Sequence, residues 1–307
     1  MNYKIIVFGG SGMVGSNLKE RLYKTKFDYF FPSRSEVDLL NKNDVINYLN
    51  QFDSSSLIIN LAGKVGGIKA NMLNNYGFLN ENIIINLNII DSAVLTNKQN
   101  LLNISSSCVY PKYQNKLLRE DDILSSKLEP TNEGYAIAKI AALKACEFIS
   151  RQLKLNYKTV IPCNLYGPYD KFGEDAHMIP AVIKRIHLSK FNKMNEIEMW
   201  GDGNVRREFM YVEDFINFLI YAINNFEKLP TIMNLGLGRD YTINEYYNAI
   251  IDVIGFKGKI KHNLKQPIGM LKKQVDISEQ LKLNWAPSFK LSEGIYKTYN
   301  YFLKNEI

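Results

Sequence analysis

Short apolar runs alternate with longer amphipathic segments through the first half of the chain. The runs that we interpret as strands cover Lys4–Phe8, Tyr29–Phe31, Leu57–Ala62, Leu101–Ile104 and Lys158–Pro162. Helices are expected over about 13–22, 80–96 and 134–153. Because strands that alternate with helices pair in parallel, the pattern predicts an α/β fold with a Rossmann-type, doubly wound parallel sheet.

Beyond Pro168 this alternation becomes irregular. We expect a helix that ends near Leu188, a short strand over Ile197–Trp200, and a further strand of the main sheet over Ile232–Leu235. The natural boundary between two domains is therefore near residue 165. Residues 1–165, rejoined by about 212–238, would form the first domain, and 166–211 with 239–307 a smaller, mixed α/β C-terminal domain.

A glycine turn follows the first strand directly, with glycines at positions 9, 12 and 15. Between a strand and a helix, such a turn lets a pyrophosphate approach the backbone and rest at the helix N-terminus. We therefore predict a dinucleotide site. The expected contacts are Gly9, Ser11, Gly12, Met13, Val14 and, at the end of the third strand, Ala62.

The end of the second strand bears on the choice between NAD and NADP. NAD enzymes usually carry an acidic residue there, whereas this chain offers Arg34, whose charge suits the 2′-phosphate of NADP. A solvated surface arginine is the plain alternative, and Glu36 and Asp38 are near enough in sequence to keep NAD open. We predict that the cofactor is NADP(H).

A serine run and a tyrosine–lysine pair follow the fourth strand. Ser106 lies at the carboxyl end of that strand, where open α/β sheets bind ligands. Tyr135 and Lys139 are four residues apart and share one face of the predicted helix. An ammonium beside a phenol should lower the tyrosine pKa toward the range of an acid–base catalyst. An ordinary amphipathic helix is the alternative for the pair alone.

Composition narrows the class of protein further. The 307 residues are 46% hydrophobic and 22% charged, as is typical of soluble globular proteins. No apolar run approaches the ~20 residues of a membrane span, and no signal peptide is recognisable, so we expect a cytoplasmic protein. The net charge of +7 forms no basic stripe, which argues against nucleic acid. Three scattered cysteines indicate reduced thiols, and no metal site is predicted.

These motifs together resemble the GDP-L-fucose synthases, a family of extended short-chain dehydrogenases/reductases. The stretches that carry the resemblance are the Gly9–Gly15 turn, Lys64–Ile68 with Ala70 and Asn71, Ser106–Lys112, Leu128–Glu133, Tyr135–Ala141, Asn164–Pro168, His177 with Ile179–Ala181, and Arg207–Phe209. The resemblance covers nearly the whole chain and weakens after about residue 240.

The resemblance implies an NADPH-dependent reduction of the ketone at carbon 4 of a GDP-4-keto-6-deoxy sugar, preceded by epimerisation at carbons 3 and 5. Such reactions serve the biosynthesis of capsule or lipopolysaccharide sugars. Tyr135 would donate the proton, Ser106 would hydrogen-bond the same oxygen, and Lys139 would hold the nicotinamide ribose. Cys108 and His177 would be base and acid of the epimerisation, since a thiol and an imidazole have reference pKa values of roughly 8.5 and 6.5.

Substrate contacts and assembly follow from the same resemblance. Arg207 is the best candidate to clamp the GDP diphosphate, because its planar fork suits bidentate phosphate binding. A surface ion pair is its alternative. Asn164 and Lys273 are further candidates for the pocket. The first domain would then bind NADP and the second the nucleotide sugar, and the two long helices would pair in a homodimer.

The chain departs from the family pattern at three places. Ser11 replaces an arginine that usually helps to hold the 2′-phosphate, so Arg34 should carry more of that selectivity. Gly134 replaces a proline before the tyrosine, which should loosen the entry to that helix. The segment from Phe172 to His177 is shorter and lacks a typical His-Pro pair.

Three functions therefore stay open. The first is the bifunctional epimerase/reductase, which Cys108 and His177 favour. The second is a reductase without epimerisation that acts on a related sugar such as a GDP-6-deoxy-heptose, which the altered approach to His177 favours. The third is a non-catalytic dinucleotide sensor, and the intact set of Ser106, Tyr135 and Lys139 argues against it.

Overall fold

A six-stranded parallel sheet forms the centre of the computed structural model, which describes residues 4–112, 116–173, 176–265 and 270–307. Its order is β10-β5-β4-β3-β1-β2. The strands are β1 (Lys4–Phe8), β2 (Asp28–Phe30), β3 (Leu57–Asn60), β4 (Asn100–Ile104), β5 (Asn156–Pro162) and β10 (Ile232–Leu235). Since β2 and β3 lie on opposite sides of β1, the sheet is doubly wound, as predicted.

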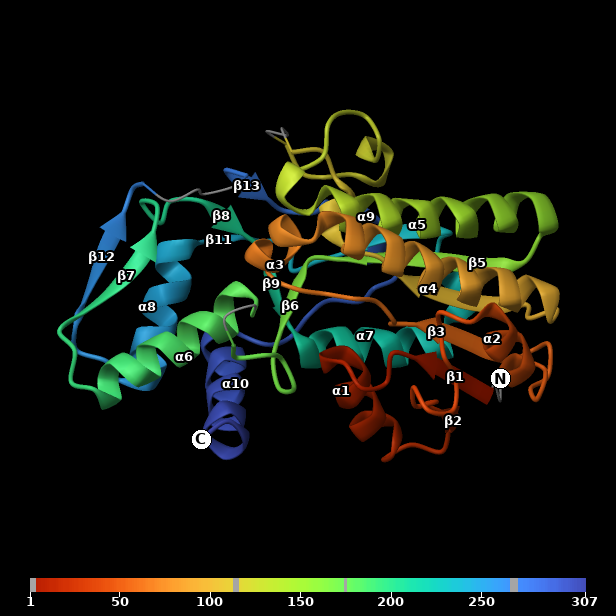
Figure 1. The fold of residues 1–307 in the computed structure, drawn as a ribbon, viewed down its shortest axis with the longest axis horizontal. Coiled ribbons are helices and arrows are strands. Elements are labelled where there is room, and N and C mark those ends of the chain that lie inside the picture. The colour runs from red at the N-terminus through yellow and green to blue at the C-terminus, as the bar shows by residue number, and fades with distance from the viewer. Residues whose placement is uncertain (1–3, 113–115, 174–175, 266–269) are drawn as a thin grey trace.

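Helices cover both faces of this sheet (Figure 1). One face carries α2 (Lys42–Leu49), α4 (Asn75–Leu95) and α5 (Glu133–Leu153), and the other carries α1 (Met13–Leu22) and α7 (Val212–Asn224). The alternation within β1 explains both layers: Ile6 and Phe8 pack in a core with Ile89 of α4, whereas Ile5 and Val7 pack in a core with Leu18 of α1.

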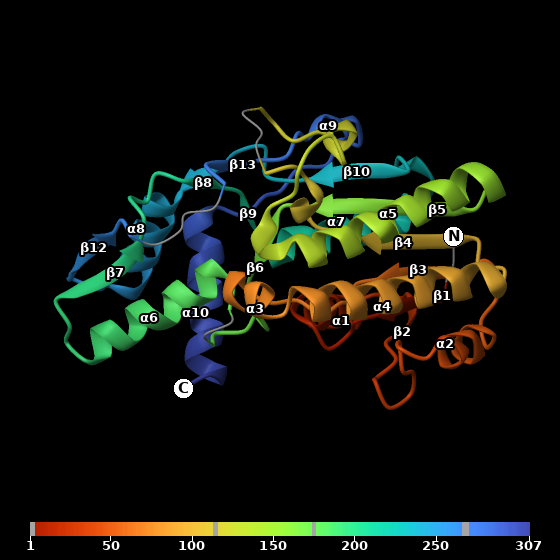
Figure 2. The ribbon, with the colours of Figure 1, turned by 45° about the horizontal axis from the view of Figure 1, so that its top comes forward.

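The remaining elements form a smaller region around short strands, on the left in Figures 1 and 2. Its strand pairs are β6 (Asn164–Tyr166) with β9 (Phe209–Tyr211) and β7 (Glu196–Trp200) with β12 (Lys259–Asn263). Strand β8 (Arg206–Arg207) lies between β11 (Tyr241–Thr242) and β13 (Lys272–Lys273). The helices there are α6 (Met178–Phe191), α8 (Ile243–Ile254) and α10 (Leu291–Asn305).

Short helices connect the larger elements. They are α3 (Ile68–Leu73), α9 (Ser278–Lys282), η1 (Ser107–Val109), η2 (Glu120–Asp122), η3 (Pro130–Asn132) and η4 (Phe226–Lys228). None of the helices in the described ranges is long and apolar enough to cross a membrane.

The predicted strands of the first half are all present, within two residues of their expected bounds. One expected boundary was wrong. The helix expected from residue 80 begins at Asn75, because the Asn74 side chain accepts a hydrogen bond from the Gly77 backbone N–H and caps it.

Gly134 was expected to loosen the entry to α5, and this was also wrong. Its backbone N–H donates to Asn75 Oδ1 over 2.8 Å, and a Cβ there would lie 2.3 Å from the Asn75 carbonyl oxygen. A proline has no N–H for this bond. The glycine therefore brings the starts of α4 and α5 into close contact.

Candidate active site

The glycine turn between β1 and α1 has the geometry that a bound pyrophosphate requires. Gly9 has a φ of +90°, and a Cβ at this position would lie 2.7 Å from the Ala62 backbone nitrogen. A Cβ on Gly12 would meet only the Gly9 carbonyl oxygen, at 3.6 Å, and no side chain of the described residues caps α1. The first-turn N–H groups, those of Met13 and Val14 among them, are thus available to an anion.

The loop after β2 presents Arg34 on the surface, while both nearby carboxylates are engaged locally. Glu36 Oε2 accepts hydrogen bonds from the backbone N–H and the hydroxyl of Ser33, each over 2.7 Å. These bonds hold the Glu36 pKa below its usual value. Asp38 Oδ1 accepts from the Leu40 N–H over 2.9 Å. Both acids are thus engaged in local hydrogen bonds, which favours the role predicted for exposed Arg34.

Strand β4 ends in a turn that places the serine run and Cys108 together. Ser106 caps the 3-10 helix η1, since its hydroxyl accepts from the Cys108 backbone N–H over 3.4 Å. Cys108 is a free thiol with 6% of its surface exposed. Burial raises its pKa, and the ammonium of Lys273 is the strongest of the groups that oppose this rise.

The pair on α5 lies against the end of β4. Lys139 is buried, and its Nζ donates to the Ile104 carbonyl over 2.9 Å and lies 5.9 Å from the centre of the Tyr135 ring. Burial lowers the Lys139 pKa to about 8. Burial also raises the pKa of Tyr135, so the expected lowering by Lys139 is wrong for the free protein. Desolvation is the main cause, Cys108 adds to it, and Lys139 is not among the groups that shift this pKa.

The smaller region contributes two cations, Arg207 and Lys273, near the turn that follows β4. Arg207 of β8 and Lys273 of β13 are register partners in neighbouring parallel strands. Burial lowers the pKa of Arg207 to about 10, with Glu129 acting in the opposite direction. Burial also lowers the pKa of Lys273, Arg207 adds to this effect, and Cys108 opposes it. The thiol and the two cations therefore belong to one electrostatic cluster.

His177 and Asn164 hydrogen-bond to other residues of the smaller region. His177 precedes α6, and its Nδ1 lies 3.4 Å from Asp170 Oδ1, which raises its pKa. His177 is not among the groups that shift the Cys108 pKa. Asn164 begins β6, and its backbone N–H donates to the Glu208 carbonyl over 3.2 Å. Residues 174 and 175 of the shortened segment lie outside the described residues.

Sequence reasoning gave no role to two residues that the structure brings to the site. Glu129 lies 3.3 Å from Lys112 Nζ and influences the pKa of Arg207. Glu208, next to Arg207, is 1% exposed and accepts three backbone hydrogen bonds. Both belong to stretches that carry the family resemblance, but acidic residues suggested no contact with an anionic substrate.

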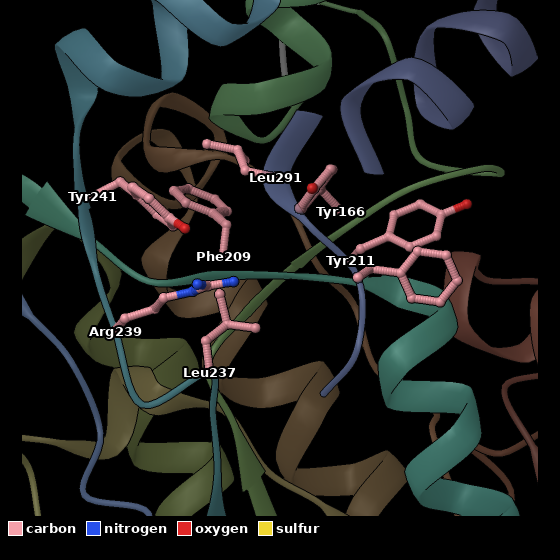
Figure 3. Close-up of a pocket in the computed structure, with 8 residues that line it drawn as sticks. Tyr166, Phe209, Tyr211, Leu237, Arg239, Tyr241 and Leu291 are labelled. Atoms are coloured by element: carbon pink, nitrogen blue, oxygen red, sulfur yellow. The ribbon is translucent and has the colours of Figure 1, made fainter. Parts of the chain in front are cut away.

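A small aromatic hollow lies beside the site, between β9, α10 and the segment that follows β10 (Figure 3). Its lining comprises Tyr166, Phe209, Tyr211, Leu237, Arg239, Tyr241, Phe289 and Leu291. None of the predicted catalytic residues is among them. The described residues also contain no group of three or more His, Cys, Asp or Glu side chains that could hold a metal ion.

The sheet, the glycine turn and the Tyr–Lys pair define a dinucleotide-binding enzyme of the Rossmann type. Residues 5–236 match the model of the NAD dependent epimerase/dehydratase family, and the chain belongs to this family. It is 46% identical to a protein named GDP-L-colitose synthase from Yersinia pseudotuberculosis, over 99% of both chains. It is 39% identical to a GDP-L-fucose synthase from Azorhizobium caulinodans, over 99% of this chain and 98% of the relative.

Solved structures agree with this assignment. The fold superposes with a TM-score of 0.87 on a GDP-mannoheptose C4 reductase from Campylobacter jejuni with NADP bound, which is 28% identical and matches over 98% of both chains. The predictions of a Rossmann-type α/β fold, of an enzyme similar to GDP-L-fucose synthases and of NADP(H) as cofactor are thereby confirmed.

Proposed function

We propose that this protein reduces the ketone at carbon 4 of a GDP-4-keto-6-deoxy sugar with NADPH, after epimerisation at carbons 3 and 5. The observation that carries the proposal is the convergence of two sets of groups at the end of β4. One set is the proton-donating pair on α5, Tyr135 and Lys139, and the other is the Cys108 thiol with Lys273 and Arg207.

The dinucleotide would lie along the carboxyl edge of the sheet. The glycine turn and the first turn of α1 would hold its pyrophosphate, with Gly9, Ser11, Gly12, Met13 and Val14 as contacts. Ala62 would face it from the end of β3, and Arg34 would pair with the 2′-phosphate. When bound, the cofactor supplies the hydride that reduces carbon 4.

Side chains of α5 and of the residue that precedes η1 would supply a proton and a hydrogen bond to the oxygen at carbon 4. Tyr135 donates its phenolic proton to the alkoxide oxygen that forms at carbon 4, and Ser106 donates a hydrogen bond to the same oxygen. Lys139, whose Nζ lies 5.9 Å from the centre of the Tyr135 ring, would stabilise the phenolate left behind and hold a ribose hydroxyl. Because burial raises the pKa of Tyr135, the phenol is fully protonated before the reaction.

Epimerisation would use the other set of groups. The carbon 4 ketone acidifies the hydrogens on carbons 3 and 5, so that Cys108 as thiolate removes one and an acid on the opposite side returns one. Lys273 supports the thiolate by its charge. His177 is the proposed acid, and the hydrogen bond to Asp170, which raises the His177 pKa, favours its protonated form. Arg207 would clamp the diphosphate, with Asn164 in the pocket.

The names of two relatives, a GDP-L-colitose synthase and a GDP-L-fucose synthase, support the epimerising activity. Both are named for GDP-linked L-sugars. The L configuration of a hexose is set at carbon 5, so an L-product from a D-sugar precursor requires inversion there. The second candidate is a reductase that omits this step. The pairing of His177 with Asp170 and the likeness to a C4 reductase of a GDP-heptose favour it.

One experiment separates the two candidates. The enzyme is incubated with NADPH and either GDP-4-keto-6-deoxy-hexose or the corresponding heptose in heavy water, and the product is examined by NMR. Epimerisation incorporates deuterium at carbon 3 or 5, and at both where both are inverted. Reduction without deuterium at either carbon would establish the reductase. No oxidation of NADPH with either ketone would refute both.

The domain division and the oligomer belong to the same proposal. The larger lobe, residues 1–165 with about 212–238, would bind NADP(H), and the smaller lobe, 166–211 with 239–307, the GDP-sugar.

Helices α4 and α5 lie side by side, and Ile137 and Phe148 of α5 are exposed on the surface. These apolar side chains support a homodimer through a four-helix interface. Light scattering at micromolar concentration tests it, and a monomer mass would refute it.

A further inference from the structure

Glu208 is a buried carboxylate for which the mechanism above has no use. It connects β8, which carries Arg207, to β9, and only 1% of its surface is exposed. A carboxylate is rarely buried to this degree unless hydrogen bonds compensate for the loss of water. Its contacts therefore indicate why the chain retains a charge at this place.

Three backbone N–H groups surround the carboxylate. Oε1 accepts from Leu237 over 2.6 Å and from Gly238 over 3.1 Å, and Oε2 accepts from Val275 over 2.9 Å. We call these residues the Glu208 clasp. Charge-assisted bonds of this kind are roughly twice as strong as neutral ones. All three partners are donors, so a carboxylate satisfies them and an amide does not.

The clasp joins segments that are far apart in sequence. Leu237 and Gly238 follow β10 of the main sheet, whereas Val275 follows β13 by two residues. Arg207 is the residue before Glu208, and Lys273 is its register partner in β13. Strands β8 and β13 are only two residues long, and such short pairings are weak by themselves. The clasp thus links the two strands that carry Arg207 and Lys273 to the segment that follows β10.

We propose that Glu208 is a positioning residue for the GDP-sugar, because its carboxylate, directly after Arg207, binds the backbone shortly after Lys273 and so fixes the spacing between the two cations. This inference rests on the proposed function, since it takes Arg207 and Lys273 to be the substrate's cations. The substrate class follows: an anionic diphosphate that bridges two cations held on adjacent strands.

Gly236 is shaped to accommodate the clasp. A Cβ at this residue would lie 2.5 Å from Glu208 Oε1 and 2.6 Å from Val275 Cγ2. The φ of Gly236 is not in the left-handed region, so an alanine there is unstrained except for these contacts. Burial raises the Glu208 pKa to about 7, and the three N–H groups oppose the rise because they stabilise the carboxylate form.

The test is a comparison of Glu208→Gln with the wild type. Glutamine keeps the volume but turns an N–H group toward at least one N–H donor of the clasp. We expect the KM for the GDP-sugar and the Kd for GDP alone to rise about 10-fold or more, as for loss of a charge-assisted hydrogen bond. The Kd for NADPH should stay within about 2-fold, because the glycine turn is not part of the clasp.

Two further variants keep the test independent of folding. Gly236→Ala adds a methyl group against Glu208 and Val275 but keeps the carboxylate. It should raise the KM for the GDP-sugar and the Kd for GDP by a smaller factor than Glu208→Gln. Asp214→Asn is the matched control, because Asp214 is equally buried and its carboxylate accepts from the backbone N–H groups of Ser288 and Phe289, over 2.8 and 3.2 Å, outside the clasp. It should lower the melting temperature and leave the KM for the GDP-sugar unchanged.

The outcomes separate this inference from the proposed function. If wild-type protein neither binds GDP nor turns over the ketone, the proposed function fails and the clasp is not at issue. If the wild type does both and Glu208→Gln changes only the melting temperature, Glu208 is structural and the inference is overturned. A loss of NADPH affinity equal to the loss of GDP affinity would also overturn it, because it would indicate general loosening.

Discussion

The cofactor side and the substrate side of the site are built in different ways. Tyr135 and Lys139 lie on one long helix that packs on the main sheet, and Lys139 is tied to the end of β4 over 2.9 Å. Arg207 and Lys273 lie on strands of two residues each, held by a buried carboxylate. The cofactor side thus has geometry fixed by local spacing, whereas the substrate side depends on contacts between distant segments.

This difference fits the division of labour in the proposed reaction. Proton transfer to carbon 4 requires a constant geometry, and a helix on a sheet provides it. The relatives are named for different sugars, colitose, fucose and mannoheptose, and short connections tolerate sequence change. Substitutions on the cofactor side and on the substrate side should therefore have separable effects.

The largest effect is expected from Tyr135→Phe, which removes only the phenolic proton donor. Reduction should fall by roughly 10²–10⁴-fold, as is typical for loss of general acid catalysis. Exchange of solvent deuterium at carbons 3 and 5 should survive, because Cys108 is unchanged. NADPH oxidation and NMR of the recovered ketone measure the two. Parallel loss of both activities would contradict the separation.

Cys108→Ser should have the opposite effect. A hydroxyl is a far weaker base than a thiolate supported by Lys273, so exchange should fall by on the order of 10²-fold or more. A ketone that already carries the product stereochemistry should still be reduced at close to the wild-type rate. If wild-type enzyme shows no exchange at all, Cys108 is a binding residue and the reductase hypothesis is correct.

Lys139→Met tests how much the burial of the Lys139 ammonium lowers the free energy of unfolding. Burial lowers the Lys139 pKa from 10.5 to about 8, a penalty on the charged form of about 3 kcal/mol. Between these pH values the unfolded chain binds the extra proton, so wild-type stability rises with pH from about 8 to about 10.5. The substitution should abolish this rise in a denaturant titration. Any stabilisation should be largest below pH 8.

Arg207→Lys asks whether the substrate side needs a bidentate fork. Lysine keeps the charge but not the planar pair of donors, so the KM for the GDP-sugar should rise roughly 10-fold, the equivalent of about 1.4 kcal/mol. The Kd for NADPH should not change, and Arg206→Lys on the same strand is the control. Equal effects of both substitutions would indicate a general disturbance of β8.

The smallest effect is expected at the edge of the cofactor side. Arg34→Ala should reduce the preference for NADPH over NADH by about 10-fold or less, since exposed ion pairs contribute roughly 1 kcal/mol. The change should lie in the apparent affinity for NADPH, and NADH kinetics should stay the same. A wild-type enzyme that uses both cofactors equally would contradict the role of Arg34.

The sequence by itself determined the features that depend on local spacing. The glycine turn, the strands of the main sheet and the shared helix face of Tyr135 and Lys139 follow from residue type and period, because backbone geometry imposes them. The family resemblance added the site residues by position. It supplied no distances, and the expected pKa of Tyr135 was wrong because burial cannot be read from a spacing of four residues.

Only the tertiary structure decided the features that join distant segments. It placed Arg207 beside Lys273, put Lys273 near Cys108, left His177 with Asp170, and surrounded Glu208 with three N–H groups. It also showed that Gly134 allows the start of α5 to pack closely against Asn75 at the start of α4. The physical reason is common to all of these: burial and electrostatic coupling depend on which segments pack together, and no local pattern along the chain encodes that.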